Sequence, residues 1–221
     1  MISVLYEDNH VLCVEKPANV PSAPDESQDD SMLDLCREYI REKYNKPGNV
    51  FIGLVHRLDR PVGGVMVFAR TSKAASRLSD SVRTRQMKKQ YLAVLDGIPK
   101  EKSGTLKDYL VKDSRTNTTR VTDEVHGKYS ELSYEVIEER NGKALVRVSL
   151  KTGRSHQIRV QFASRHLPLV HDQRYNPAAS RGPIGLYACR LEFPHPVRKE
   201  PVVIEHNPPH TSPWNQFEVL K

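Results

Sequence analysis

The sequence predicts an α+β protein that folds as a single domain over residues 1–221. Strand-like and helix-like runs are mixed along the chain, without the regular strand–helix–strand rhythm that a parallel sheet requires. The strongest local signal is a hairpin, because two alternating apolar runs at residues 130–139 and 143–151 are joined by Asn141-Gly142. No long linker separates two halves, and the last third is rich in proline, which disfavours long helices. We therefore expect a central, mostly antiparallel mixed sheet, flanked by helices and loops, with a basic cleft across one face.

The first third of the chain predicts two strands and a helix. Residues 3–6 and 10–15 are apolar runs separated by a polar turn. Residues 20–30 are rich in proline, serine and acids, which indicates a loop. Ser31 can then cap a helix, and Asp34 occupies the third helical position, as in a capping box. A Lys-Pro-Gly sequence further on ends this helix.

The middle of the chain predicts a second helix and several strands. Thr71 or Ser72 caps the helix. Residues 91–95 read as a strand, and residues 105–125, which are polar and weakly patterned, as short strands. Residues 158–162 fit both a strand and a helix, because their apolar positions alternate and are also four apart.

The composition indicates a basic protein with a polyanionic partner. Lys and Arg number 34 against 27 Asp and Glu, which gives a net charge of +7. Residues 71–90 are strongly basic, which alone is typical of a solvated helix face, but a second basic region at residues 152–174 favours RNA. No apolar run approaches the ~20 residues of a membrane span. The three cysteines are far apart and no signal peptide is evident, so we expect reduced thiols in a cytoplasmic protein.

The most informative segment is HRLDRPVGGVMVFART, residues 56–71. Asp59 lies between Arg57 and Arg60, in a loop shaped by proline and two glycines and followed by an apolar strand. A single acid among bases is most often a loop cap or an ion pair. Here the loop would hold the carboxylate at a defined place beside a site that attracts anions, which suggests chemistry on a nucleic acid.

Two further segments contain candidate site residues. In LKTGRSHQIRVQFASRHLPLVHD, residues 150–172, Arg154 and Arg159 can each bind a phosphate or a carboxylate bidentately. In Lys88-Lys89-Gln90-Tyr91 the tyrosine opens an apolar strand beside two lysines. Tyr91 can be a core residue or can stack on an unpaired base.

Other kinds of site are not indicated. The nine histidines include no metal-binding spacing, the glycines form no phosphate-binding loop, and no serine nucleophile motif is present. We expect no metal and no cofactor.

The segments above resemble, in order, motifs of RluA-type RNA pseudouridine synthases. HRLDRPVGGVMVFART is similar to the family's HRLD segment, and YEDNHVLCVEKP, KQYLAVL, TGRSHQIRV and LYACRLEFPHP are similar to four others. The match extends from Tyr6 to Pro196, nearly the whole chain. It leaves no room for an N-terminal S4 RNA-binding domain, so the family's catalytic domain would stand alone.

The resemblance implies an isomerase that converts uridine in structured RNA, ribosomal or transfer RNA, to pseudouridine without cofactor or metal. Asp59 would be the essential carboxylate, which either attacks the nucleoside or removes a sugar proton. Tyr91 would stack on the extruded uracil, and Arg159 would pair with Asp59, since an opposite charge favours the ionised carboxylate. The remaining candidates would hold phosphate or line the pocket: Arg57, Arg60, Lys88, Lys89 and Arg154 bind RNA, while Ile158 and Leu186 form an apolar wall. His56, His156 and Gln157 would be scaffold residues.

The chain departs from the family pattern at several positions. Val62 stands where threonine or serine is usual, Gln161 where histidine is usual, and His171 replaces the glycine before Asp172. These changes bear on substrate identity more than on activity. Two other functions remain open: a catalytically silent RNA-binding protein or RNA chaperone on the same fold, and a metal-assisted hydrolase using His166, His171 and Asp172. We expect a monomer with RNA as its partner and no contact with membranes.

Overall fold

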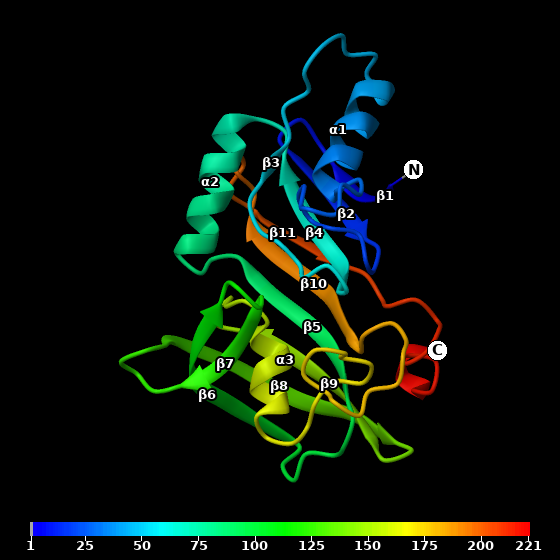
Figure 1. Cartoon of the computed structure of the whole chain (residues 1–221). Coiled ribbons are helices and arrows are strands. Elements are labelled where there is room, and N and C mark those ends of the chain that lie inside the picture. Colours follow the sequence, from blue (N-terminus) through cyan, green and yellow to red (C-terminus); the bar gives the residue numbers. More distant parts are fainter. Residues whose placement is uncertain (1) are drawn as a thin grey trace. The chain divides into compact units, whose positions relative to one another are not determined.

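The computed structural model describes residues 2–221 and confirms the predicted α+β class (Figure 1). Two compact units are present. The first contains the chain up to Lys89 together with Ala188–Asn207, and the second contains Gln90–Tyr187 together with Pro208–Lys221. The single-domain assignment stays a prediction. No helix within residues 2–221 is both long and apolar enough to cross a membrane.

The first unit is a sheet covered by helices. Its strands follow the order β1 (Ser3–Glu7), β2 (Val11–Lys16), β4 (Gly63–Ala69) and β10 (Leu186–Pro194), with β3 (Gly53–Leu54) beside β4 and β11 (Pro201–Glu205) beside β10. The pairings β1–β2, β2–β4, β3–β4 and β10–β11 are antiparallel.

The core of the first unit lies between this sheet and helix α2 (Ser72–Arg83). Val65 and Val67 of β4 are buried in one cluster with Ala74 and Leu78 of α2. Every residue of β4 is buried, so the segment after Asp59 is firmly anchored.

The helix starts of the first unit follow local sequence rules. The Ser31 side chain accepts a hydrogen bond from the Asp34 backbone and Asp34 bonds back to the Ser31 backbone, which confirms the predicted capping box of α1 (Met32–Lys43). The Thr71 side chain caps α2 by accepting from the Ala74 backbone.

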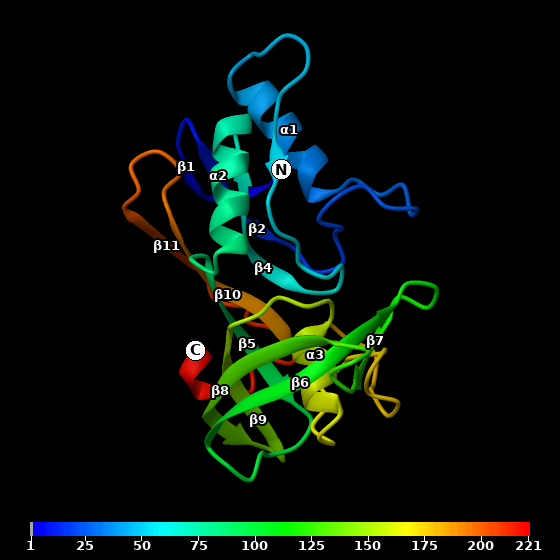
Figure 2. The same cartoon turned by 90° about the vertical axis from the view of Figure 1, so that its left-hand side faces the viewer.

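The second unit contains a meander of strands, the α-helix α3 (Gln157–Ala163) and a short 3-10 helix η1 (Glu218–Leu220). Its strands follow the order β5 (Lys88–Leu95), β9 (Lys143–Leu150), β8 (Lys128–Arg140), β6 (Ser103–Asp113) and β7 (Thr118–Thr122), and β8, β6 and β7 lie side by side in Figure 2. β9–β8, β8–β6 and β6–β7 are antiparallel. The predicted hairpin is confirmed: Arg140 pairs with Lys143, and Asn141 and Gly142 have φ of 51° and 72°, as a tight primed turn requires.

One predicted feature of the second unit is wrong and one open question is settled. β6 is eleven residues long rather than a short strand, because it pairs with β8 along most of its length and with β7 at its far end. Hydrogen bonds to β8 and β7 hold these polar residues in an extended conformation, although their sequence pattern does not predict a long strand. Residues 158–162 are helical, within α3 (Gln157–Ala163). All residues from Gln157 to Phe162 are buried, so this part of the helix has no solvent-exposed face to give its sequence a helical period.

Candidate active site

The predicted site residues fall in both units. Asp59, Arg57 and Arg60 belong to the first unit, as do Lys88 and Lys89, the first two residues of β5. Tyr91, Arg154, Ile158 and Arg159 belong to the second, as does Leu186, the first residue of β10.

The loop that holds Asp59 is fixed on both sides of the carboxylate. On one side Leu58 is buried, its N–H donates to the Ser22 hydroxyl at 3.1 Å, and the same hydroxyl donates to the Leu58 carbonyl at 2.8 Å. On the other side the buried Val62 donates its N–H to the Asp59 carbonyl at 2.9 Å, which closes a turn around Pro61. Asp59 itself is half-buried. The backbone anchors on both sides therefore fix the part of the loop that carries Asp59.

His56 acts as a structural residue below this loop. Its Nε2 accepts a hydrogen bond from the Val67 backbone at 3.1 Å, which joins the start of the loop to β4. Burial, and then the charge of Lys89, hold the pKa of His56 well below its usual range. The ring is therefore neutral, with its proton on Nδ1, and within residues 2–221 Nδ1 has no hydrogen-bond partner.

Lys16 supports the loop from beneath and was not identified from the sequence. Its side chain is fully buried, and Nζ donates to the Arg60 carbonyl at 2.9 Å and to the Pro17 carbonyl at 3.0 Å. Burial lowers the pKa of Lys16 to about 7, against the opposing effect of the Asp59 charge. The only signal in the sequence is the Lys-Pro pair that ends the first family-like segment.

The predicted RNA-binding bases of the first unit differ in how far they are already neutralised. Arg60 pairs with Asp25 at 3.3 Å and with Asp29. Lys88 pairs with Glu192 at 2.7 Å. Lys89, by contrast, has no acidic partner among the described residues of the first unit, 2–89 and 188–207, and burial lowers its pKa to about 8.

In the second unit Arg159 is buried in a bidentate ion pair. Its Nε donates to Asp172 Oδ2 at 2.9 Å and its Nη2 to Asp172 Oδ1 at 2.7 Å. The two side chains are only 5% and 0% exposed. The predicted pairing of Arg159 with Asp59 stays a prediction, while the pairing with Asp172 was missed by the sequence reasoning, which considered Asp172 only as a metal ligand.

A tyrosine and a histidine complete the surroundings of Arg159. The Arg159 guanidinium carbon lies 5.1 Å from the centre of the Tyr175 ring. The Tyr175 hydroxyl accepts from the Thr119 backbone at 2.8 Å and lies 2.7 Å from His156 Nδ1. His156 directly precedes α3 and has a φ of 52°.

The remaining candidates of the second unit are positioned as follows. Tyr91, Ile158 and Leu186 are buried, with 7%, 4% and 5% exposure, which suits an apolar wall and also plain packing. Arg154 is exposed, and its Nε donates to the Tyr129 carbonyl at 3.0 Å. The Gln157 amide accepts from the Arg154 backbone at 2.9 Å, so it acts as the predicted scaffold.

The departures from the family pattern have structural counterparts. Gln161 is fully buried and joins Asp108 to Gln157 through its amide, at 2.7 and 3.0 Å. His171 adopts a φ of 58°, a left-handed conformation that favours the glycine usual at this position. Its ring lies over Gly182, where an added Cβ would be only 2.4 Å from His171 Nδ1.

No metal-binding group of three His, Cys, Asp or Glu side chains is assembled within residues 2–221. Asp172, one of the three residues considered for a hydrolase, is instead bonded to Arg159.

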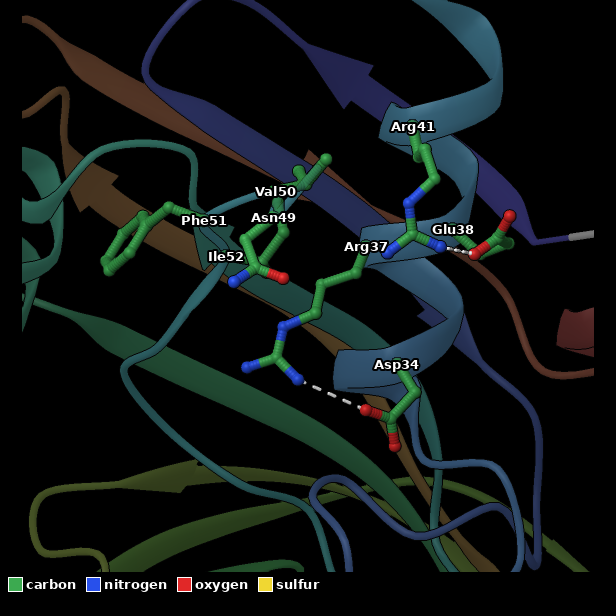
Figure 3. Close-up of a pocket in the computed structure, with 8 residues that line it drawn as sticks. All are labelled: Asp34, Arg37, Glu38, Arg41, Asn49, Val50, Phe51 and Ile52. Atoms are coloured by element: carbon green, nitrogen blue, oxygen red, sulfur yellow. Dashed lines mark hydrogen bonds and ion pairs between the residues drawn. The ribbon is translucent and has the colours of Figure 1, made fainter. Parts of the chain in front are cut away.

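A surface pocket of about 670 Å³ lies between α1 and residues 49–52 of the first unit (Figure 3). Arg37 and Arg41 line it, but each is paired with an acid one helical turn earlier, Arg37 with Asp34 at 3.2 Å and Arg41 with Glu38. None of the predicted site residues lines this pocket.

Comparison with solved structures defines the class of the fold. The chain is similar to the human RNA pseudouridylate synthase domain containing 4, with a TM-score of 0.79 and 21% identity, covering 94% of this chain and 88% of that one. The human RNA pseudouridylate synthase domain containing 1 is also similar, with a TM-score of 0.76 and 23% identity over 96% and 85% of the two chains. The fold is therefore that of a pseudouridine synthase domain.

The sequence shows the family directly: this chain belongs to the RNA pseudouridylate synthase family, which matches residues 10–164. It is 31% identical over 209 residues to an uncharacterised RNA pseudouridine synthase of Bacillus subtilis, covering 92% of this chain and 68% of that protein. It is 32% identical over 217 residues to the ribosomal large subunit pseudouridine synthase D of Xanthomonas campestris, covering 91% and 64%. The chain thus spans about two thirds of the length of these relatives.

Proposed function

We propose that this chain isomerises uridine to pseudouridine in structured RNA, with Asp59 as the catalytic carboxylate. The observation that supports this most strongly is the Asp59 loop, a family motif whose backbone is anchored by Ser22 and Val62 on either side of the acid. Such anchoring keeps a reacting group in place, and correct placement alone can supply several kcal/mol of a barrier.

The reaction breaks the glycosidic bond between the sugar C1′ and uracil N1 and forms a bond between C1′ and C5. The proton on C5 is lost and N1 gains one, so atoms and electrons balance without a co-reactant. Asp59 either attacks the nucleoside or removes a sugar proton. We assign Tyr91 to stacking on the uracil and Arg159 to pairing with Asp59, in an apolar pocket that includes Ile158 and Leu186.

Ribosomal RNA is the substrate class we favour over transfer RNA, because several relatives are named as ribosomal large subunit pseudouridine synthases. The target nucleotide must leave its stack to reach an acid in a protein loop. We further propose that the protein acts as a monomer in the cytoplasm.

Among the predicted RNA-binding bases, Lys89 is best suited to a phosphate. Lys88 and Arg60 already have acidic partners, whereas the half-buried Lys89 has none in the part of the first unit that the structure describes. Arg57 is exposed and the Arg154 Nε donates to a backbone carbonyl, so neither is neutralised by an acid within residues 2–221.

The test is pseudouridine mapping of ribosomal and transfer RNA from cells that lack this gene, repeated after adding back wild type, Asp59→Asn or Asp80→Asn. Asp80 is a matched control, since it is an exposed carboxylate of the same unit that, within residues 2–221, forms an ion pair with Arg83 on its own helix and with no other base. We expect one or a few sites to disappear and to return with wild type and Asp80→Asn but not with Asp59→Asn.

Other outcomes contradict the proposal in different ways. Restoration by Asp59→Asn removes the catalytic assignment of Asp59. An unchanged map, together with purified protein that binds RNA but forms no pseudouridine, supports the RNA chaperone instead.

A further inference from the structure

The ion pair of Arg159 and Asp172 is costly to bury, and stabilisation of the fold alone does not explain its presence. Both side chains are buried. Desolvation of two charges offsets most of their attraction, and a well-packed apolar pair is often equally stable. A buried pair of this kind therefore points to a need for a particular geometry.

We propose that Asp172 and Tyr175 are positioning residues that set the orientation of the Arg159 guanidinium for the isomerisation of uridine. This inference rests on the proposed function, in which Arg159 pairs with the catalytic carboxylate. It adds two residues to which the sequence analysis gave no role in this reaction.

Asp172 fixes the plane of the guanidinium. Two parallel N–H···O bonds, from Nε and Nη2, hold one edge of the planar guanidinium. The carboxylate is itself held, because the backbone N–H groups of Arg174 and Tyr175 donate to Oδ1 at 3.1 and 3.2 Å. Arg159 is thus bound to a group that cannot easily turn.

Tyr175 covers one face of the same guanidinium. Its ring centre lies 5.1 Å from the central carbon, and its hydroxyl is anchored by Thr119 and His156. One edge and one face of Arg159 are therefore set by two independently anchored side chains.

This arrangement sets the direction in which Arg159 meets Asp59 in the proposed function. A guanidinium has five N–H donors, and the bonds to Asp172 use one from Nε and one from Nη2. A displacement of the partner group by ~1 Å can cost about 100-fold in rate, so fixing Arg159 contributes directly to the chemical step.

The first test compares Asp172→Asn with wild type on an RNA that wild type modifies. The amide keeps the size of the side chain but presents N–H groups where the guanidinium needs an acceptor. We expect kcat to fall roughly 10- to 100-fold while KM changes by less than about threefold. A kcat within about twofold of wild type, or a change in KM alone, overturns the role of Asp172.

Asp108→Asn is the matched control. Asp108 forms a similar two-bond pair with Arg165 at 2.9 and 3.1 Å in the same unit. The Asp108→Asn variant should have a lower thermal stability than wild type but an unchanged kcat. An equal loss of kcat in both variants reduces Asp172 to a purely structural residue.

Tyr175 supplies a second pair of variants, which keeps the inference testable if Asp172→Asn does not fold. Tyr175→Phe keeps the ring over Arg159, and Tyr175→Leu removes it. We expect kcat to be about tenfold lower in the leucine variant than in the phenylalanine variant. This is less than the loss of about 100-fold in rate that a full displacement of ~1 Å can cause. Equal kcat values overturn the role of the ring.

A measurement without substrate separates this inference from the proposed function. The Nε–H resonance of Arg159, assigned by its loss in Arg159→Lys, should be protected from solvent exchange in wild type and lose that protection in Asp172→Asn. Unchanged protection overturns the positioning role. Wild-type protein that forms no pseudouridine on any RNA contradicts the proposed function instead.

Discussion

The buried Lys16 makes a sharp prediction about the pH dependence of stability. Its ammonium lies fully inside the first unit, below the Asp59 loop, and burial brings its pKa to about 7 from an ordinary value of 10.5. Because the folded state disfavours the charged form, the unfolded chain binds more protons between these two values. Stability must therefore rise with pH across that window, at up to about 1.4 kcal/mol for each pH unit.

The perturbation is Lys16→Met, which keeps an apolar stem of similar length and removes the titrating group. The free energy of unfolding is measured with urea at pH 6, 7, 8 and 9 for both proteins. Between pH 8 and pH 9 we expect wild type to gain about 1.4 kcal/mol relative to Lys16→Met. Other titrating groups, including Lys89, are common to both proteins and cancel in the difference.

A difference that is independent of pH from 7 to 9 would refute the reasoning, since Lys16 would then titrate alike in both states. Asp59→Asn provides a second check. The Asp59 charge opposes the lowering of the Lys16 pKa. Without it, the rise in stability should begin at a lower pH than in wild type.

Three further predictions follow from the structure. Burial raises the pKa of Asp8, but hydrogen bonds from the backbone and neighbouring side chains outweigh this effect and bring the pKa to about 2. From pH 4 to pH 2, wild type should therefore lose about 2 kcal/mol more stability than Asp8→Asn. Parallel acid unfolding curves of the two proteins would contradict this. Gly182→Ala should lose roughly 1–3 kcal/mol through its clash with the His171 ring, and His171→Gly should remove most of that loss, whereas an equal loss in both backgrounds would exclude the clash. Lys89→Gln should lower the steepness of the plot of log RNA affinity against log salt concentration by about 0.7–0.9. Lys88→Gln should lower it by less, because Glu192 already neutralises Lys88. A larger effect of Lys88→Gln would contradict the assignment of Lys89 as the better phosphate ligand.

The features that the sequence predicted well depend on residues close together in the chain. The capping box of Ser31 and Asp34 involves one helical turn, and the Asn141-Gly142 hairpin depends on two residues with positive φ. The Asp59 loop was singled out because proline and glycine constrain the backbone beside the acid. The family motifs then suggested its chemistry.

The features that were missed depend on contacts between distant residues. Lys16 bonds to the carbonyl of Arg60, 44 positions away, and nothing in its neighbourhood marks it as buried. A lysine in a polar-rich chain is ordinarily exposed. Asp172 lies 13 positions from Arg159, across a loop whose path no periodicity describes.

By itself, the sequence determined the fold class, the helix caps, the hairpin and the family of this protein, because each of these depends on local residue types or on ordered motifs. Only the tertiary structure decided which charges are buried together, that residues 158–162 form a helix, and which partners hold Lys16 and Arg159. The physical reason is that burial and ion pairing depend on how distant segments pack. A linear pattern can name a charged residue, but only the folded chain determines the groups that surround it.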